Sequence, residues 1–325
     1  MFKNKATCQL VQHIIIDTDG RVDDIIALLL FLNAEKEGLV KIEAICCTRN
    51  ANTTVENVCK NVIRILQLIR RTDIPIYQGA QNPIICPDGK IALYHGEDGF
   101  GDLHYDEEPD LSIIQKEPSA IGMNAIVSRH PGEIYLVCLG PLTNVALAMI
   151  LYKDFASSLK EIYIMGGNYK AIGNVTRTAE FNFHVDPESV HIILRNAKCP
   201  ISILPWETCA ITKMTMDWRF EELGNVNDPM IQLLNKAEKS VYRDRLSEHW
   251  YPCDAFLAIT LIYPECIRKE GIYHATIELN GKETRGQVVL DHLNENESNV
   301  RIIKRVNENF VQDILYKSFR TGFAE

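Results

Sequence analysis

Asp17-Thr18-Asp19-Gly20-Arg21-Val22-Asp23-Asp24 is the stretch of this sequence from which the fold can be worked out. It follows the apolar run Ile14-Ile15-Ile16 and precedes a second apolar run at residues 25–32. The first run predicts a buried strand and the second predicts a helix, so the acids lie on the turn between them. In open α/β sheets, the turn at the carboxyl end of a strand is where ligands bind.

Four carboxylates on one turn repel each other unless a positive charge lies among them. A hard divalent cation such as Ca²⁺ or Mg²⁺, which prefers oxygen ligands, fits such a cluster. The alternative is a helix N-terminus whose acids serve as caps and complement the helix dipole. That alternative accounts for Asp23 and Asp24 but not for Asp17 and Asp19, which lie on the strand side. The segment therefore favours a metal or catalytic site.

Strand-like and helix-like patterns alternate through the first two-thirds of the chain. Apolar runs predict strands at 13–16, 42–47, 134–138, 162–165 and 201–204. Helical patterns lie at 23–33, 55–69, 120–129, 142–151 and 187–196. Because the strand runs are continuously apolar, they indicate a parallel sheet that is covered on both faces. We predict one α/β domain over residues 1–325, with an ordered core at about 13–320: a doubly wound, mostly parallel sheet with helices on both faces.

The last third of the chain has a different pattern. A helix-rich stretch at 228–262 is followed by predicted strands at 272–279, 287–290 and 300–306. Asn280-Gly281 is predicted to form the turn of a hairpin. A helix at 308–319 closes the chain.

The composition excludes some classes of partner. The chain has 325 residues, of which 46% are hydrophobic, and a formal net charge of -9, so it lacks the basic balance of a nucleic-acid-binding protein. No apolar stretch approaches the length of a membrane span, and no apolar run follows the first residues as a secretory signal needs. The ten cysteines form no Cys-x-x-Cys pair, so we expect reduced thiols and a cytoplasmic location.

Several polar loops follow predicted strands. They contain Asn52, the acid- and glycine-rich segment 95–102, the segment 140–144, Gly166-Gly167-Asn168 and the segment 173–182. Because each follows a strand, these loops are candidates for the same sheet edge as the opening acids.

Four blocks in order make the chain similar to a known family. They are D-T-D-G-R-V-D-D at 17–24, L-G-P-L-T-N-V-A-L-A at 139–148, M-G-G at 165–167 with G-N-V-x-x-x-A-E-F-N-x-x-x-D-P-E at 173–188, and C-D-A at 253–255. With these blocks the chain resembles the inosine-uridine preferring nucleoside hydrolases over nearly its whole length. The resemblance implies the nucleoside hydrolase fold and hydrolysis of ribonucleosides to free base and ribose.

The resemblance also implies a Ca²⁺ site. The carboxylates of Asp19, Asp24 and Asp254 and the main-chain carbonyl of Leu139 are the expected ligands, which matches the oxygen preference of Ca²⁺. Asp19 is the expected general base that activates water for attack on the anomeric carbon. Asp17 is expected to support the turn from behind.

Further positions match the substrate-binding residues of the family. Asp23 is expected to accept a hydrogen bond from a ribose hydroxyl, and His95 is expected near the base. The other expected ribose-binding residues are Asn52, Asn174, Glu180 and Asn182. Carboxylate and amide groups suit a polyol, which both donates and accepts hydrogen bonds.

This chain departs from the common family pattern at two places. Most members carry Pro-Gly where this chain has Gly20-Arg21, and a branch without Pro-Gly prefers purines, so we expect a lean towards purine nucleosides. Gly20 still permits a tight turn, and for Arg21 we favour a solvated or structural role over pairing with a neighbouring acid.

The second departure is Cys253, which stands where other branches have a His or a Trp beside the last metal-binding Asp. A thiol donates a proton less readily than a protonated histidine, so we favour a packing role for Cys253 and leave the leaving-group acid unassigned. His249, Trp250 and Tyr251, just upstream, are candidates to stack on the base or to hydrogen-bond with it.

Two rival functions stay open from the sequence. A haloacid dehalogenase-like phosphatase also begins with an apolar strand and D-x-D-G, although Arg21 is wrong for that pattern. A non-catalytic ribonucleoside-binding protein on the same fold is the second rival, and Asp19 argues against it because pure binding needs no general base. We expect the family's homodimer or homotetramer.

Overall fold

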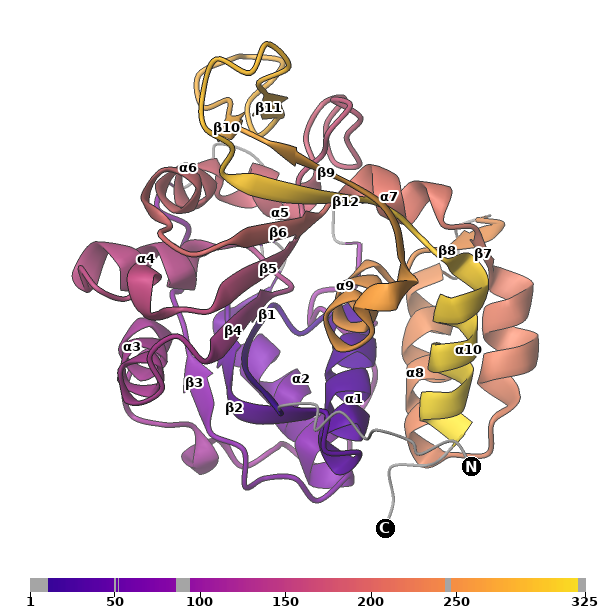
Figure 1. The fold of residues 1–325 in the computed structure, drawn as a ribbon. Helices are drawn as coiled ribbons and strands as arrows, with labels where there is room; N and C mark the ends of the chain where they lie inside the picture. The colour runs from indigo at the N-terminus through magenta and orange to yellow at the C-terminus, as the bar shows by residue number, and fades with distance from the viewer. Residues whose placement is uncertain (1–10, 50, 52, 86–93, 243–246, 321–325) are drawn as a thin grey trace, which may run out of the picture.

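The structure is a computed structural model that describes residues 11–49, 51, 53–85, 94–242 and 247–320. Asn52, which is predicted to bind ribose, lies outside the described residues. Figure 1 shows a central sheet with helices packed on both of its faces.

The central sheet has the strand order β3-β2-β1-β4-β5-β6-β12-β9. Its strands are β1 (Gln12–Thr18), β2 (Val40–Cys47), β3 (Ile76–Gln78), β4 (Ile134–Cys138), β5 (Glu161–Met165), β6 (Ile201–Leu204), β9 (Ile267–Tyr273) and β12 (Val300–Val306). All neighbouring strands are parallel except β12 and β9, which are antiparallel. The predicted doubly wound, mostly parallel sheet is confirmed.

The two faces of the sheet carry separate hydrophobic cores, because successive side chains of a strand point to opposite faces. Ile14 and Ile16 belong to one core and Ile15 to the other. The first core includes α1 (Val22–Lys36), α2 (Val55–Leu68), α8 (Pro229–Tyr242), α9 (Cys253–Ile262) and α10 (Glu308–Arg320). The second includes α3 (Ser119–Arg129), α4 (Thr143–Leu151) and α6 (Pro187–Asn196). Each fully buried isoleucine contributes on the order of 2 kcal/mol.

The strand order reverses at β1, which has β2 on one side and β4 on the other. Such a point opens a crevice outside the carboxyl ends of the two strands, and ligands of α/β proteins bind there. Asp17 is paired with Cys138 across β1 and β4, and the Leu139 amide donates to the Asp17 carbonyl at 2.8 Å. The acidic turn and the residue Leu139 therefore lie side by side at the carboxyl edge.

The C-terminal strands differ from the prediction. The strand predicted at 272–279 is two strands, because β9 pairs with β12 whereas β10 (Ala275–Ile277) pairs with β11 (Val288–Leu290) in a separate two-stranded sheet. The hairpin exists, but Asn280-Gly281 does not form a two-residue turn. The Glu278 amide donates to the Gln287 carbonyl, and the positive φ of the loop is at Gly286.

The helix-rich stretch is also interrupted. Two short strands, β7 (Met214–Thr215) and β8 (His249–Trp250), pair in an antiparallel manner beside α8. Two short helices, α5 (Phe181–Val185) and α7 (Trp206–Ile211), follow β5 and β6 at the carboxyl edge of the sheet. No helix in the part of the chain that the structure describes is long and apolar enough to cross a membrane.

Candidate active site

The acidic turn is shaped by Gly20 and by hydrogen bonds to Asp24. Gly20 has a φ of 66°, and a Cβ atom at this position would lie 2.9 Å from Val58 Cγ1. Thr18 Oγ1 donates to Asp24 Oδ1 at 2.5 Å, and the Asp19 amide donates to the same oxygen at 3.0 Å. Asp24 lies in the first turn of α1, where the helix dipole favours a negative charge.

Three carboxylates meet beside this turn. Asp23, Asp24 and Asp254 each offer an oxygen atom, and these atoms all lie within 4.8 Å of one another. Asp254 comes from the first turn of α9, which packs on α1. Among the described residues, Asp24 Oδ2 and both carboxylate oxygens of Asp254 are buried without a hydrogen-bond partner. Buried carboxylates without partners are costly unless they hold a cation, so this cluster fits a hard metal ion.

The surroundings of the Asp254 carboxyl disfavour its charged form. Burial, and then repulsion from Asp24 and Asp23, raises this pKa well above its ordinary value. A divalent cation among the same oxygens would favour the charged carboxylates, because it compensates the charges that burial and repulsion penalise.

Arg21 is the cation that the structure itself places in the site. Its Nε donates to Asp19 Oδ1 at 2.7 Å, its Nη2 donates to Asn182 Oδ1 at 3.3 Å, and its Cζ lies 4.8 Å from the centroid of the Phe181 ring. The Arg21 side chain is only 11% exposed. The solvated role favoured from the sequence is therefore wrong, and the alternative of pairing with an acid is what the structure shows. Burial opposes the charge of Arg21, but attraction to Asp19, Asp23, Asp24 and Asp254 raises its pKa well above the ordinary value.

Asp17 lies on the strand side of the turn. Asn144 Nδ2 donates to Asp17 Oδ1 at 2.8 Å and also to the Cys47 carbonyl at 3.2 Å, so it links β1 and β2 to the start of α4. Burial raises the pKa of Asp17 to about 8, although the Asn144 hydrogen bond opposes this. Asp17 does not line the cavity described below, and its supporting role stays a prediction.

Asn182 joins the ends of β4 and β5. Its Nδ2 donates to the Leu139 carbonyl at 2.8 Å and to the Met165 carbonyl at 3.1 Å. The Leu139 carbonyl, the predicted main-chain ligand, thus accepts from Asn182, whose Oδ1 in turn accepts from Arg21. The predicted ribose-binding role of Asn182 stays a prediction.

Glu180 and Asn174 are held by the start of α5. Glu180 Oε1 accepts from the main-chain amide of Asn182 at 2.8 Å. Its Oε2 accepts from the main-chain amides of Phe183, at 3.1 Å, and Gly167, at 2.8 Å. Asn174 Oδ1 accepts from the Phe181 amide at 2.9 Å. Both side chains line the cavity, in positions fixed by main-chain donors.

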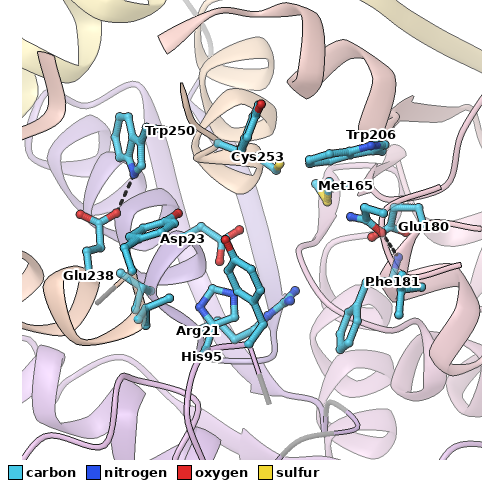
Figure 2. Close-up of a pocket in the computed structure, with 17 residues that line it drawn as sticks. Arg21, Asp23, His95, Met165, Glu180, Phe181, Trp206, Glu238, Trp250 and Cys253 are labelled. Carbon is cyan, nitrogen blue, oxygen red and sulfur yellow. Dashed lines mark hydrogen bonds between the residues drawn. The ribbon is translucent and has the colours of Figure 1, made fainter. Parts of the chain in front are cut away.

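A cavity of about 420 Å³, the size of a small-molecule site, lies beside the acidic turn and has Asp23 in its lining. In Figure 2, Asp23 lies between a wall that bears Trp250 and Glu238 and an opposite wall that bears Trp206, Glu180 and Phe181. The residues that line the cavity are Arg21, Val22, Asp23, Tyr94, His95, Met165, Asn174, Val175, Glu180, Phe181, Trp206, Glu238, Val241, Tyr242, Trp250, Tyr251 and Cys253.

Trp250 and His249, two of the candidates to contact the base, differ in position. Trp250 lines the cavity, and its Nε1 donates to Glu238 Oε1 at 2.6 Å, whereas His249 does not line the cavity and contacts the Tyr251 ring. Cys253 lines the cavity but is only 5% exposed. Contact with Cys209, and then burial, raises the pKa of the Cys253 thiol well above its ordinary value.

Sequence reasoning missed part of the cavity wall. Trp206 directly follows β6 and Pro205, so the rule about the carboxyl ends of strands offered a signal for it. The sequence held no such signal for Glu238, because a Glu in an amphipathic helix predicts a position on the solvated face. In the structure Glu238 is buried, and Arg219 Nε lies 2.6 Å from its Oε2. Tyr94 and Tyr242, whose rings are in edge-to-face contact, were also missed.

The sequence profile of the family "Inosine-uridine preferring nucleoside hydrolase" matches residues 14–313 of this chain. The chain is 28% identical over 281 residues to "Non-specific ribonucleoside hydrolase RihC" of Salmonella newport (strain SL254), which covers 86% of this chain and 87% of that protein. It is 32% identical over 183 residues to "Probable uridine nucleosidase 2" of Oryza sativa subsp. japonica, which covers 56% of this chain. The match covers about half the length of this rice relative, 53%, and 54% of the length of a second rice relative, "Probable uridine nucleosidase 1".

Solved structures agree with these sequence matches. The structure of "Inosine-Guanosine Nucleoside Hydrolase (IG-NH)" matches with a TM-score of 0.85 and 28% identity, and covers 94% of this chain and 98% of that one. "Purine-Preferring Ribonucleoside Hydrolase from Gardnerella vaginalis" matches with the same TM-score of 0.85 at 19% identity, over 95% of this chain and 98% of that one, which shows a shared fold.

Proposed function

The chain belongs to the inosine-uridine preferring nucleoside hydrolase family, and from this premise we propose that it hydrolyses the N-glycosidic bond of ribonucleosides to free nucleobase and ribose. One observation carries the proposal. Among the described residues, buried carboxylate oxygens of Asp24 and Asp254 without hydrogen-bond partners meet at the carboxyl edge of the sheet, beside a cavity large enough for a nucleoside. With the family match, the phosphatase alternative has no remaining support.

The donor set supports a Ca²⁺ site. Asp24 and Asp254 would hold the ion, and Asp23 lies close enough to both to share it. Asp19 and the carbonyl of Leu139 are added as ligands from the family resemblance. A bound divalent cation supplies Lewis-acid polarisation of water and a template for the ribose hydroxyls.

The protein's own carboxylates perform the proton and charge chemistry in this proposal. A carboxylate oxygen of Asp19 takes a proton from the attacking water, whose oxygen bonds to the anomeric carbon as the C–N bond breaks. The base leaves with the bonding electron pair and gains a proton from an acid that is not assigned. Asp23 accepts a hydrogen bond from a ribose hydroxyl and orients the sugar. The surrounding acids stabilise the positive charge that develops on the ribose.

Aromatic side chains among the residues that line the cavity suit the leaving base. The rings of Trp206 and Tyr251 lie 5.3 Å apart between centroids, and those of Tyr94 and Tyr242 lie 6.3 Å apart. Such rings cover a planar base and exclude water from the scissile bond. His95 contacts Tyr94 and lines the same cavity, so it is the residue we place nearest the base.

The proposal is tested by measuring release of free base and reducing sugar from inosine, adenosine, guanosine, uridine and cytidine, with and without a chelator. We expect turnover that chelation abolishes and Ca²⁺ restores, with higher kcat/KM for purine nucleosides. Tight nucleoside binding without turnover would instead favour the non-catalytic binding protein. Full activity in excess chelator would contradict the metal site.

The location and the assembly stay predictions. The cytoplasmic location is proposed from the reduced-cysteine pattern, and the homodimer or homotetramer is proposed from the family. Light scattering coupled to size-exclusion chromatography tests the assembly, and a monomer would contradict it.

A further inference from the structure

We infer that Arg21 and the divalent cation compete for the carboxylate of Asp19, so that Arg21 is a positioning residue that stabilises the metal-free site and weakens its affinity for the ion. This inference rests on the cation site of the proposed function. It concerns a residue of the acidic turn itself.

Asp19 is the acid of the turn that the guanidinium of Arg21 approaches most closely. Asp23, Asp24 and Asp254 form the group of mutually close carboxylates, whereas Asp19 Oδ1 accepts from Arg21 Nε at 2.7 Å. The same Nε lies 3.8 Å from Asp24 Oδ2, an oxygen without a hydrogen-bond partner among the described residues. Arg21 thus contacts the two acids of the turn that are expected to bind the cation.

The guanidinium is held in this position from two other sides. Asn182 accepts from its Nη2, and the Phe181 ring lies against its Cζ. Asn182 is itself fixed by the carbonyls of Leu139 and Met165. Asn182 is buried and the Arg21 side chain is only 11% exposed, so these contacts hold the guanidinium inside the site.

The charges then act against each other. Among the described residues that line the cavity, Arg21 is the one arginine or lysine, and its charge offsets part of the repulsion among the buried carboxylates. With the ion bound, the guanidinium is a like charge a few ångströms away from it. Removing that charge while keeping the side-chain volume should therefore strengthen Ca²⁺ binding by about tenfold, since nearby like charges repel each other and water screens part of this repulsion.

The test compares the full-length wild-type protein with Arg21→Met, Arg21→Lys and the control Arg305→Met, whose arginine is exposed on β12. Ca²⁺ dissociation constants are measured by isothermal titration calorimetry. Melting temperatures are measured in chelator and in saturating Ca²⁺. Arg21→Met keeps the apolar length of the side chain, and Arg21→Lys keeps the charge.

We expect Arg21→Met to bind Ca²⁺ about tenfold more tightly than wild type, with Arg21→Lys and Arg305→Met within about threefold of wild type. The melting temperature of Arg21→Met should fall in chelator but not in saturating Ca²⁺. Unchanged or weaker Ca²⁺ binding by Arg21→Met, or an equal loss of melting temperature in both conditions, would overturn the inference. If one of these results is found while the wild type still binds Ca²⁺ and hydrolyses nucleosides, only the inference about Arg21 is overturned. A wild-type protein that does neither would overturn the proposed function as well.

Discussion

At the scale of single residues, burial decides which charges the site must compensate. Asp19, Asp24 and Asp254 are fully buried, so their charges are not screened by water and must be compensated by a cation or by Arg21. Residues that are chemically alike therefore differ in role. Asp17 is held by Asn144 and does not line the cavity, whereas Asp23 lies on the cavity wall.

Asp19→Asn removes the proposed proton acceptor but keeps the shape of the side chain. We expect kcat to fall by at least about 10²-fold, because general base catalysis typically contributes that much or more. Steady-state kinetics on inosine measure the loss, and circular dichroism and the melting temperature show whether the fold is intact. A folded Asp19→Asn protein that keeps most of its kcat would sink the base assignment.

Cys253→Ala tests whether the thiol protonates the leaving base. Because the thiol is buried against Cys209 and its pKa is raised, we expect kcat to stay within about threefold for both purine and pyrimidine nucleosides. The comparison of inosine with uridine is the measurement. A loss confined to the poorer leaving group would show that the thiol is an acid.

At the scale of elements, the junction between β1 and α1 positions the acids. Gly20 adopts a positive φ that places Asp19 at the strand end and lets α1 begin at Val22 with Asp24 in its first turn. A Cβ atom on Gly20 would point towards α2, where Val58 leaves no room for a methyl group. The turn therefore depends both on backbone conformation and on packing.

Gly20→Ala should destabilise the protein more than Gly38→Ala. Gly38 has a similar positive φ of 74°, but a Cβ there meets nothing within 4 Å, so it reports the conformational cost alone. That cost is about 1–2 kcal/mol, and the contact with Val58 at position 20 adds to it. Urea denaturation measures both variants. Equal losses of unfolding free energy would mean that the contact with Val58 is relieved without cost.

At the scale of the whole molecule, the site joins parts of the chain that are far apart in sequence. Asp24 and Asp254 come from the first turns of α1 and α9, which pack against each other in the first core. A cation held by both would join two helices separated by most of the chain, so metal binding and folding stability are coupled.

Chelation should therefore lower the melting temperature of the whole protein. At a Ca²⁺ concentration of about 100 times Kd, binding adds about 2.7 kcal/mol, which corresponds to a shift on the order of 5 °C for a domain of this size. Differential scanning calorimetry with and without chelator measures the shift. In the variant Asp254→Ala, Ca²⁺ should no longer raise the melting temperature, and an undiminished rise would contradict the role of Asp254 in the site.

Much of the fold was predictable because the buried strands are continuous apolar runs. The strands that were missed lack that signal. β9 is an edge strand whose pattern is mostly exposed, and β3 has only three residues. The strand predicted at 272–279 was wrong because one apolar run serves two sheets, and periodicity says nothing about which partner a strand selects.

The sequence by itself determined the acidic turn, the sheet edge on which it lies and the family whose motifs it carries. Those features depend on local pattern and on the rule that binding turns follow strands. Only the tertiary structure decided that Arg21 points inward, that Asp23, Asp24 and Asp254 converge, and that Glu238 and Trp206 form opposite walls. The reason is physical. The direction of a charged side chain is set by the sum of charges around it, and those charges come from elements that only packing brings together.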